Sequence, residues 1–237
     1  MHNKEFELNT FYTRIYKRYD LINRLFTFGL DTKWRNYAAQ ECFKVQPENV
    51  LDLCCGTGDL IISLCQNLKG SEKITGFDFN LKMLEKARLK LQKKGYNNVI
   101  FEHGHAAAMP FETGAFDAVT IGFGFRNLTF NNPDAQKHLN ELARVIKQGG
   151  FLFILESGVP QNRAIQFFYR LYLYMVLIPL GGLISGNVRA YWYLAHSSSK
   201  FYSTDKIERM LAEKGFKCTK SGSFFFGACN LLSFQKL

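Results

Sequence analysis

The sequence predicts an α/β fold built on a parallel sheet, and three observations support this. Short apolar runs alternate with amphipathic stretches between Asn49 and Glu156, as in strands that are joined by helices. A glycine-containing turn follows the first run and Asp78 ends the second, where such sheets often bind ligands. Of the 237 residues, 47% are hydrophobic and 21% are charged, which excludes a disordered chain and an ordinary coiled coil.

Five strands are expected, each short, apolar and flanked by polar or glycine-containing connections: residues 50–54, 73–78, 99–103, 118–122 and 151–156. An apolar helix should follow the glycine-containing turn. A second helix is expected between Asn80, a suitable N-cap, and Gly95, because apolar residues recur there at helical spacing. A third is expected over residues 133–146, before the helix breakers Gly149 and Gly150.

The segments outside this core differ from it in composition. We expect one domain over residues 1–237, with a helical N-terminal segment (1–45), a ligand-binding core (46–158), a cap (159–200) and a closing unit (201–237). Residues 6–43 are rich in aromatic and basic side chains and should be helical, with a break at Gly29. The closing unit should hold a helix over 203–214 and strands around 223–226 and 228–234.

The run 171–185 in the cap is almost wholly apolar. Pro179 and the pair Gly181 and Gly182 interrupt it, and it is shorter than the roughly 20 residues needed to cross a bilayer, so we expect no transmembrane span. Two interpretations remain. It is either a buried helix of the core, or an apolar lid beside a lipid-like substrate, with arginines directed toward lipid headgroups: Arg163, Arg170 and Arg189.

The net charge of +10 is confined to the two ends of the chain. Residues 1–35 carry a net +3, residues 36–160 carry none, and residues 161–237 carry +7. This asymmetry indicates an anionic partner, either nucleic acid or a membrane surface, unless the lysines only form solvated faces. The six cysteines follow no C-x-x-C spacing and the N-terminus lacks a secretory pattern, so we expect reduced cytosolic thiols and no metal site.

The turn after the first strand reads Asp-Leu-Cys-Cys-Gly-Thr-Gly-Asp over residues 52–59. A third glycine of the dinucleotide pattern would fall at Ile61, and Asp52 and Asp59 would repel a pyrophosphate. Acidic groups suit a cation such as S-adenosylmethionine, which needs no phosphate cradle. Asp78 ends the second strand twenty positions after Gly58, where a carboxylate can accept hydrogen bonds from ribose hydroxyls.

Taken together, these segments resemble the class I S-adenosylmethionine-dependent methyltransferases, which have a Rossmann-like sheet. The resemblance is closest to the C-methyltransferases of menaquinone and ubiquinone biosynthesis, and it runs nearly from end to end. The segments that carry it are Tyr19 and Asp20 with Asn23, residues 28–30 near Trp34, and residues 51–60, 109–111, 116–129, 144–156, 177–186, 193–195 and Ser197.

The resemblance implies a set of residues that bind S-adenosylmethionine: Cys55, Gly56, Thr57, Gly58, Asp78, Phe79, His105, Ala106 and Gly122. Three of them depart from the family pattern. His105 stands where the family has Asp or Asn, Gly122 where it often has Ser, and Cys55 where it often has Gly. A neutral imidazole at His105 is expected to accept the hydrogen bond of the adenine amino group.

The resemblance also implies C-methylation of a reduced polyprenyl quinol. A ring carbon becomes nucleophilic only when the neighbouring hydroxyl is ionised, so Arg126 is expected to stabilise the phenolate or to orient a water that takes the proton. Asn127 should hydrogen-bond a quinol oxygen, and Tyr19 should position the ring or relay a proton. The alternatives are a structural salt bridge for Arg126 and a packed aromatic for Tyr19.

The preferred substrate is demethylmenaquinol, reached by peripheral binding to the inner face of the cytoplasmic membrane, with a homo-oligomer possible. The 2-methoxy-6-polyprenyl-benzoquinol of ubiquinone synthesis is the alternative acceptor. An RNA methyltransferase is less favoured because no nucleic-acid-binding module is added to the core. A binding protein that has lost turnover is disfavoured because Arg126 and Asn127 are retained.

Overall fold

The computed structural model describes residues 3–237, so the first two residues of the predicted segment 1–45 lie outside the described residues. Its sheet has the strand order β3-β2-β1-β4-β5-β7-β6. The strands are β1 (Asn49–Leu53), β2 (Lys73–Asp78), β3 (Ile100–His103), β4 (Phe116–Gly122), β5 (Ile146–Ser157), β6 (Phe216–Phe224) and β7 (Cys229–Lys236). The first five are parallel, whereas β7 is antiparallel to both β5 and β6. The predicted α/β fold with a parallel core is confirmed.

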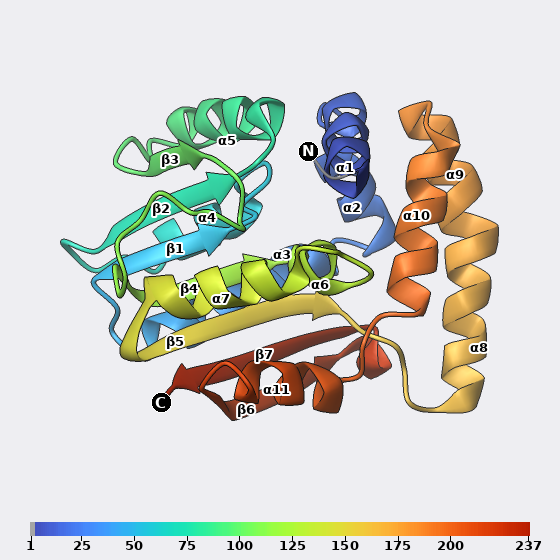
Figure 1. Cartoon of the computed structure of the whole chain (residues 1–237). Coiled ribbons are helices and arrows are strands. Elements are labelled where there is room, and N and C mark those ends of the chain that lie inside the picture. The colour runs from blue at the N-terminus through green and yellow to red at the C-terminus, as the bar shows by residue number, and fades with distance from the viewer. Residues whose placement is uncertain (1–2) are drawn as a thin grey trace.

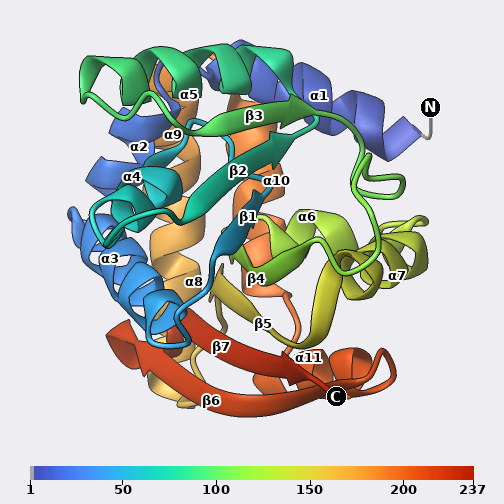
Figure 2. The same cartoon turned by 90° about the vertical axis from the view of Figure 1, so that its left-hand side faces the viewer.

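Helices cover both faces of this sheet (Figure 2). On one face lie α3 (Leu30–Phe43), α4 (Asp59–Cys65) and α5 (Leu81–Lys93), and on the other lie α6 (Phe125–Thr129), α7 (Ala135–Val145) and α11 (Thr204–Ala212). Each face has its own apolar core, in which helix residues such as Leu64 and Leu139 pack on strand residues that are removed from water. The predicted cap on α5 is present, because the Asn80 side chain accepts a hydrogen bond from the backbone N–H of Met83.

Two predicted boundaries were wrong. β5 starts at Ile146, directly after α7, so Gly149 (φ +77°) and Gly150 lie inside the strand instead of separating it from the helix. The strand expected at residues 223–226 is instead the end of β6, which begins at Phe216, and residues Phe225–Gly227 form the turn into β7. The first error arises because Ile146 pairs with Phe116 of β4 ahead of the apolar centre of β5, and the second because pairing with β7 starts β6 at Phe216.

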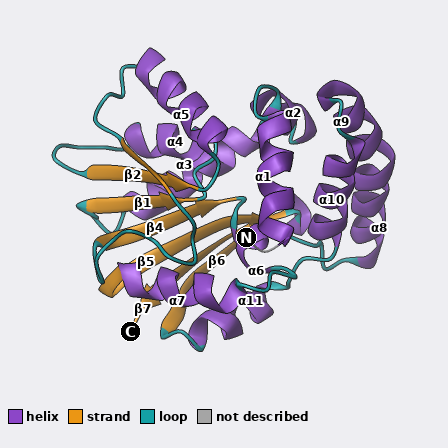
Figure 3. Cartoon of the chain, turned by 45° about the horizontal axis from the view of Figure 1, so that its top comes forward, coloured by secondary structure: helices purple, strands orange, loops and turns teal. Residues whose placement is uncertain are grey.

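The N-terminal segment is helical and breaks at Gly29 (φ +74°) as predicted. A second break after Ile15 divides its first part into α1 (Asn3–Ile15) and α2 (Tyr19–Phe26). These helices lie between the sheet and an outer helical layer (Figure 1). The layer consists of α8 (Arg163–Tyr172), a π-helical turn (Leu173–Leu177), α9 (Ile178–Ser185) and α10 (Val188–Ser199), and it stands beside the sheet in the third view as well (Figure 3).

The outer layer corrects the expectation for the apolar run. Residues Arg163–Ser185 form one helix of 23 residues, which is long and apolar enough to cross a membrane, so the argument from its length was wrong. Pro179 does not stop the helix because it lies in the first turn of α9, directly after the π-helical turn. Only 22% of its most apolar window is buried, so it is not a fully buried core helix either.

The carboxyl ends of the parallel strands point toward α1, α2 and the outer layer (Figure 1). In open α/β sheets this edge is where ligands bind. The fold therefore places the N-terminal helices and the outer layer over the functional edge of the sheet.

Candidate active site

The glycine-containing loop after β1 is held against the end of β2. Cys54 (φ +59°), Gly56 (φ +53°) and Gly58 (φ +79°) all have left-handed backbone conformations. This path turns the backbone N–H of Gly56 toward Asp78, whose Oδ2 accepts it at 2.8 Å. Asp78 Oδ1 accepts a second hydrogen bond from Asn80 N at 2.9 Å. The loop and the carboxylate of Asp78 are thus assembled as one unit.

Burial raises the pKa of Asp78 to about 6, against the lowering effect of these two backbone hydrogen bonds. The carboxyl is therefore largely ionised at neutral pH. Nearby on β1, burial raises the pKa of Asp52 to about 7, with a hydrogen bond from Thr120 to its Oδ1 opposing the shift. The other oxygen of Asp52 has no hydrogen-bond partner among the described residues. Two buried carboxyls in and beside the loop suit a cationic ligand better than a phosphate.

A cavity lies above this loop, and we call it the glycine-loop cavity. Six of the nine predicted cofactor residues line it: Gly56, Asp78, Phe79, His105, Ala106 and Gly122. The sequence did not single out several further lining residues, among them Tyr12, Asp134 and His138. The available signal was the spacing of Asp134, which is the N-cap of α7, and His138 four residues later in that helix.

Three predicted residues lie outside the lining of this cavity. Cys55 is buried under the loop, and its backbone N–H donates to Phe77 O. Thr57 directs its hydroxyl to Asp20 on α2. Gly58 is the N-cap of α4, and a Cβ at this position would lie 2.9 Å from Leu91, so the close approach of α5 requires glycine. These three residues therefore shape the loop without lining the cavity.

His105 has a defined tautomer when it is neutral. Its Nδ1 accepts a hydrogen bond from Ala107 N at 3.2 Å, so the ring hydrogen is on Nε2. In this tautomer Nε2 is a donor and Nδ1 is already engaged by the backbone. The His105 ring lies 5.2 Å from that of His138 on α7.

A second cavity of about 390 Å³ extends from the first toward the outer layer, and we call it the apolar cavity. Its wall comes from α1, α2, α3, α8, the π-helical turn and α10, and is mostly aromatic and aliphatic. Among the described residues, three charged side chains interrupt this wall: Asp31, Arg35 and Arg126. Its size lies in the range of small-molecule binding sites.

The two cavities share three lining residues: Tyr12, Tyr19 and Phe123. The Tyr12 and Tyr19 rings meet edge to face with centroids 5.9 Å apart. Phe123 is held at φ +61°, a conformation that a bulky side chain adopts only when its surroundings impose it. A ligand in one cavity would therefore meet a ligand in the other at these three side chains.

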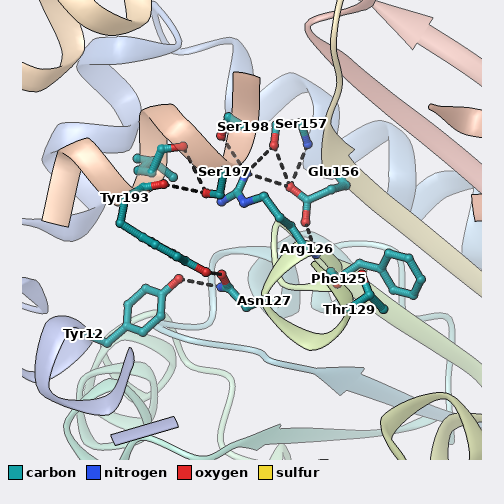
Figure 4. A network of polar contacts seen from close by, with 11 residues as sticks. Tyr12, Phe125, Arg126, Asn127, Thr129, Glu156, Ser157, Tyr193, Ser197 and Ser198 are labelled. Carbon is teal, nitrogen blue, oxygen red and sulfur yellow. Dashed lines mark hydrogen bonds and ion pairs between the residues drawn. The ribbon is translucent and has the colours of Figure 1, made fainter. Parts of the chain in front are cut away.

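Arg126 is 3% exposed and lies at the centre of a polar network (Figure 4). Its backbone N–H donates to Glu156 Oε2 at 3.0 Å, and its Nη1 lies 3.4 Å from Glu156 Oε1. Nη1 also donates to the hydroxyls of Ser157 and Ser198. The Nε atom has no hydrogen-bond partner among the described residues. Arg126 thus forms the structural salt bridge of the alternative interpretation and also lines the apolar cavity.

Asn127 joins two tyrosines from different layers (Figure 4). Its Nδ2 donates to Tyr12 Oη on α1 at 2.7 Å, and its Oδ1 accepts from Tyr193 Oη on α10 at 3.3 Å. The side chain lines the glycine-loop cavity, whereas Arg126 lines the apolar one. The short helix α6 therefore presents one of the predicted catalytic residues to each cavity.

The pKa values of the two tyrosines at the junction, Tyr12 and Tyr19, depend on burial and on nearby charges. Burial raises the pKa values of Tyr12 and Tyr19, and the positive charge of Arg126 acts in the opposite direction on both. Tyr19 is influenced in the same way by Arg35. A phenol bound in this place would meet the same opposing effects, burial that disfavours its ionised form and nearby arginines that favour it.

The residues of the glycine-loop cavity fit S-adenosylmethionine. Asp78 can hold ribose hydroxyls, and Phe79 and His105 can hold the adenine. The cavity has a free volume of only about 80 Å³, less than the roughly 300 Å³ of small ligand sites. Helix α1 closes it, because Asn80 Nδ2 donates to Asn9 Oδ1 at 2.6 Å and to Thr13 Oγ1 at 2.8 Å. Leu8 and Tyr12 of α1 also line the cavity, so a shift of α1 would enlarge it.

Comparison with known proteins agrees with this arrangement. The model of the ubiE/COQ5 methyltransferase family matches residues 1–235. The demethylmenaquinone methyltransferase of Thermus thermophilus is 44% identical over 205 residues, which cover 86% of this chain and 90% of that protein. The enzyme of the same name from Thermotoga maritima is 40% identical over 215 residues, covering 90% of each chain.

Among solved structures, an S-adenosylmethionine-dependent methyltransferase from Clostridium acetobutylicum superimposes with a TM-score of 0.64. The match covers 92% of this chain and 97% of that one at 15% identity, so it supports the fold.

Proposed function

The chain belongs to the ubiE/COQ5 methyltransferase family, and from this premise we propose that it transfers a methyl group from S-adenosylmethionine to a ring carbon of demethylmenaquinol. The observation that carries this proposal is the junction of the two cavities at Tyr12, Tyr19 and Phe123. One cavity has the residues for a nucleoside and the other is large and apolar. Methyl transfer needs this juxtaposition, because donor and acceptor atoms must approach to about 3–3.5 Å in line.

S-adenosylmethionine, when bound, supplies an electrophilic methyl group on its sulfonium. The residues that would hold it are Gly56, Asp78, Phe79, His105, Ala106 and Gly122, which line the glycine-loop cavity. Asp78 is prearranged for this by its hydrogen bonds from Gly56 N and Asn80 N. We expect Cys55, Thr57 and Gly58 to act by shaping the loop.

We propose that Arg126 stabilises the quinolate, which is the quinol with one hydroxyl ionised. Its guanidinium is fixed by Glu156 and two serine hydroxyls, so it need not reorganise when a negative charge develops nearby. Burial raises the pKa values of Tyr12 and Tyr19 and the charge of Arg126 opposes this rise, so Arg126 would act in the same direction on a quinol hydroxyl, which is also a phenol. Burial of the site excludes water that would otherwise screen this charge.

Tyr19 and Asn127 are assigned positioning roles. Tyr19 lies in the wall of both cavities, where its ring can orient the quinol. Asn127 is hydrogen-bonded to Tyr12 and Tyr193. It would therefore act on a quinol oxygen through these phenols, or bind that oxygen in place of one of them. The relatives named above favour the naphthoquinol over the benzoquinol as acceptor, since both are demethylmenaquinone methyltransferases.

Peripheral membrane binding is the part of the proposal that explains how the substrate arrives. Four phenylalanines line the apolar cavity and are nevertheless 73%, 65%, 54% and 74% exposed, and we call them the aromatic rim: Phe28, Phe168, Phe225 and Phe226. Arg170 is exposed two positions after Phe168 on the same helix, as expected of a surface that meets anionic lipids. We propose that the rim dips into the inner face of the cytoplasmic membrane, so that the prenyl chain enters the cavity from the bilayer.

The test is a transfer assay with labelled S-adenosylmethionine and a short-chain demethylmenaquinol kept reduced. The matching benzoquinol and bulk RNA serve as competing acceptors. The proposal predicts label in the naphthoquinol and none in RNA. Binding of S-adenosylmethionine without transfer to either quinol would overturn it.

A further inference from the structure

Asp31 is the one carboxylate among the described residues that line the apolar cavity. It lies in the first turn of α3 and is 1% exposed. Arg35, one helical turn later, is 6% exposed and lines the same cavity. A buried acidic group in a wall of aromatic and aliphatic side chains is costly and calls for a physical reason.

Donors hold the Asp31 carboxylate in one orientation. Its Oδ2 pairs with Arg35 Nη1, and its Oδ1 accepts from Thr27 Oγ1 at 3.0 Å. Arg24 Nε lies 3.7 Å from Oδ1 on the solvent side. Apolar residues of similar volume often stabilise a fold as well as a buried ion pair does. Stability alone therefore does not require charges at this place.

Arg35 of this pair, and also Arg24 beside Asp31, border a polar cleft on the other side of α3. Arg35 lines both the apolar cavity and this cleft, whose other residues are largely polar and include Asp20, Asn36, Asp59, Ser63 and Lys90. The guanidinium carbon of Arg35 lies 5.1 Å from the ring centroid of Phe123, which borders both cavities. The pair thus extends from the junction of the cavities to a polar surface away from the aromatic rim.

We propose that Asp31, oriented by Arg35, accepts the proton that the quinol loses, and that this proton leaves through the polar cleft. The inference rests on the proposed function and supplies its general base. Arg126 stabilises the resulting charge but cannot readily take a proton itself. A proton released toward the aromatic rim would enter lipid, whereas the cleft offers polar groups and water.

The step balances as follows. The quinol O–H bond breaks, its proton goes to an Asp31 oxygen, and the electron pair remains on the quinol oxygen. The neighbouring ring carbon forms a bond to the methyl carbon while the carbon–sulfur bond breaks, and that electron pair stays on sulfur. The same ring carbon then loses its hydrogen as a proton while the oxygen regains one, so one methyl group is gained and one proton is released overall.

The test compares Asp31→Asn with Glu41→Gln in the full chain, using two demethylmenaquinols. Glu41 is the matched control, because it lies on the same helix, is 7% exposed and pairs with Lys44 and Lys220 outside the cavities. One quinol is unsubstituted and the other carries a ring halogen that makes its hydroxyls more acidic. Loss of a general base should lower kcat about 100-fold for Asp31→Asn, with the KM for S-adenosylmethionine changed less than about threefold.

The deficit of Asp31→Asn should shrink at least about tenfold with the more acidic quinol, because less help is needed to ionise it. Glu41→Gln should behave as wild type with both. Equal losses on the two quinols, or no loss, would overturn the assignment while leaving the proposed function intact. A wild-type enzyme that binds S-adenosylmethionine but methylates neither quinol would overturn the proposed function as well. If Asp31→Asn does not fold, Asp31→Glu, which keeps the carboxylate, is tested in its place. Any loss of kcat in Asp31→Glu must likewise shrink with the more acidic quinol.

Discussion

Thr57 of the glycine-containing loop donates its hydroxyl hydrogen bond to Asp20 of α2. Asp20 Oδ2 also binds Lys86 Nζ and Lys90 Nζ of α5, each at 2.8 Å. One carboxylate of the N-terminal segment therefore ties the loop after β1 to the helix after β2. Together with the contacts of Asn80 to α1, this fastens the N-terminal helices over the glycine-loop cavity.

Replacing Asp20 should loosen this closure. Asp20→Ala leaves Thr57 and two lysines without their shared acceptor, and hydrogen bonds to a charged group contribute about 1.5–3 kcal/mol. We expect the Kd for S-adenosylmethionine, measured by calorimetry, to rise about tenfold, with faster association and dissociation. Glu85→Ala removes an exposed pair with Lys82 on the same α5 and should leave the Kd unchanged. An equal rise in Kd for the two variants would show that Asp20 does not hold the N-terminal helices over the glycine-loop cavity.

Asp78 should make cofactor binding depend on pH. Burial raises its pKa to about 6, and only the ionised carboxylate can accept from both ribose hydroxyls. Acidification through pH 6 protonates the free site, so affinity for S-adenosylmethionine should fall up to about tenfold per pH unit below this value. Above pH 7 the affinity should be constant.

Two variants separate Asp78 from the imidazoles nearby. Asp78→Asn should bind S-adenosylmethionine weakly at every pH, with the dependence around pH 6 gone. His105→Asn should retain that dependence, because the carboxylate is still present. A wild-type affinity that stays flat between pH 5 and 7 would show that Asp78 does not bind as the carboxylate.

The part of the site that follows local rules was predictable from the sequence. The glycine-containing loop, Asp78 at the end of β2 and the cap at Asn80 depend on the chain within about thirty residues of each other. The resemblance added Arg126 and Asn127. Tyr12 and Asp31 were missed because their place in the cavities depends on how α1 and α3 fold back over the sheet. The acidic and basic pair Asp31 and Arg35, four residues apart, was the only local signal, and it also occurs on ordinary helix surfaces.

The outer layer was harder to predict for a different physical reason. Pro179 and two glycines usually break a helix, but the π-helical turn before them keeps Arg163–Ser185 continuous. Whether such a helix is buried depends on its partners. Leu173 is 5% exposed against α2 and α10, whereas Leu183 is 79% exposed. A composition-based argument cannot divide one apolar run into these two faces.

The aromatic rim should govern membrane binding. Phe28, Phe225 and Phe226 have left-handed backbone conformations, which keep bulky side chains directed outward at some conformational cost. Burying a phenylalanine gains about 1.5–3 kcal/mol, so Phe28→Ala with Phe226→Ala should lower the partition coefficient onto anionic vesicles at least about tenfold. Sedimentation with phosphatidylglycerol-containing vesicles measures this.

The matched control for the rim is Leu89→Ala, which removes a side chain that is 59% exposed on α5. It should not alter the partition coefficient. The rim variant should still methylate a short-chain quinol added in detergent, since the reacting groups are untouched. Unchanged vesicle binding would remove the rim from the proposal, and a loss of activity on the soluble substrate would mean that the rim shapes the cavity itself.

Arg126 and Glu156 allow the catalytic and structural contributions of one ion pair to be separated. Arg126→Met leaves Glu156 buried without its charged partner, so the free energy of unfolding should fall by about 3–5 kcal/mol in urea denaturation. Adding Glu156→Gln removes the uncompensated charge and should recover most of that stability, because a neutral amide can still bond to Ser157. Turnover should not recover, since no cation remains beside the quinol oxygen, and it should stay below about 1% of wild type with S-adenosylmethionine binding intact. If the stable double variant regained turnover, Arg126 would be needed only to hold α6 against β5.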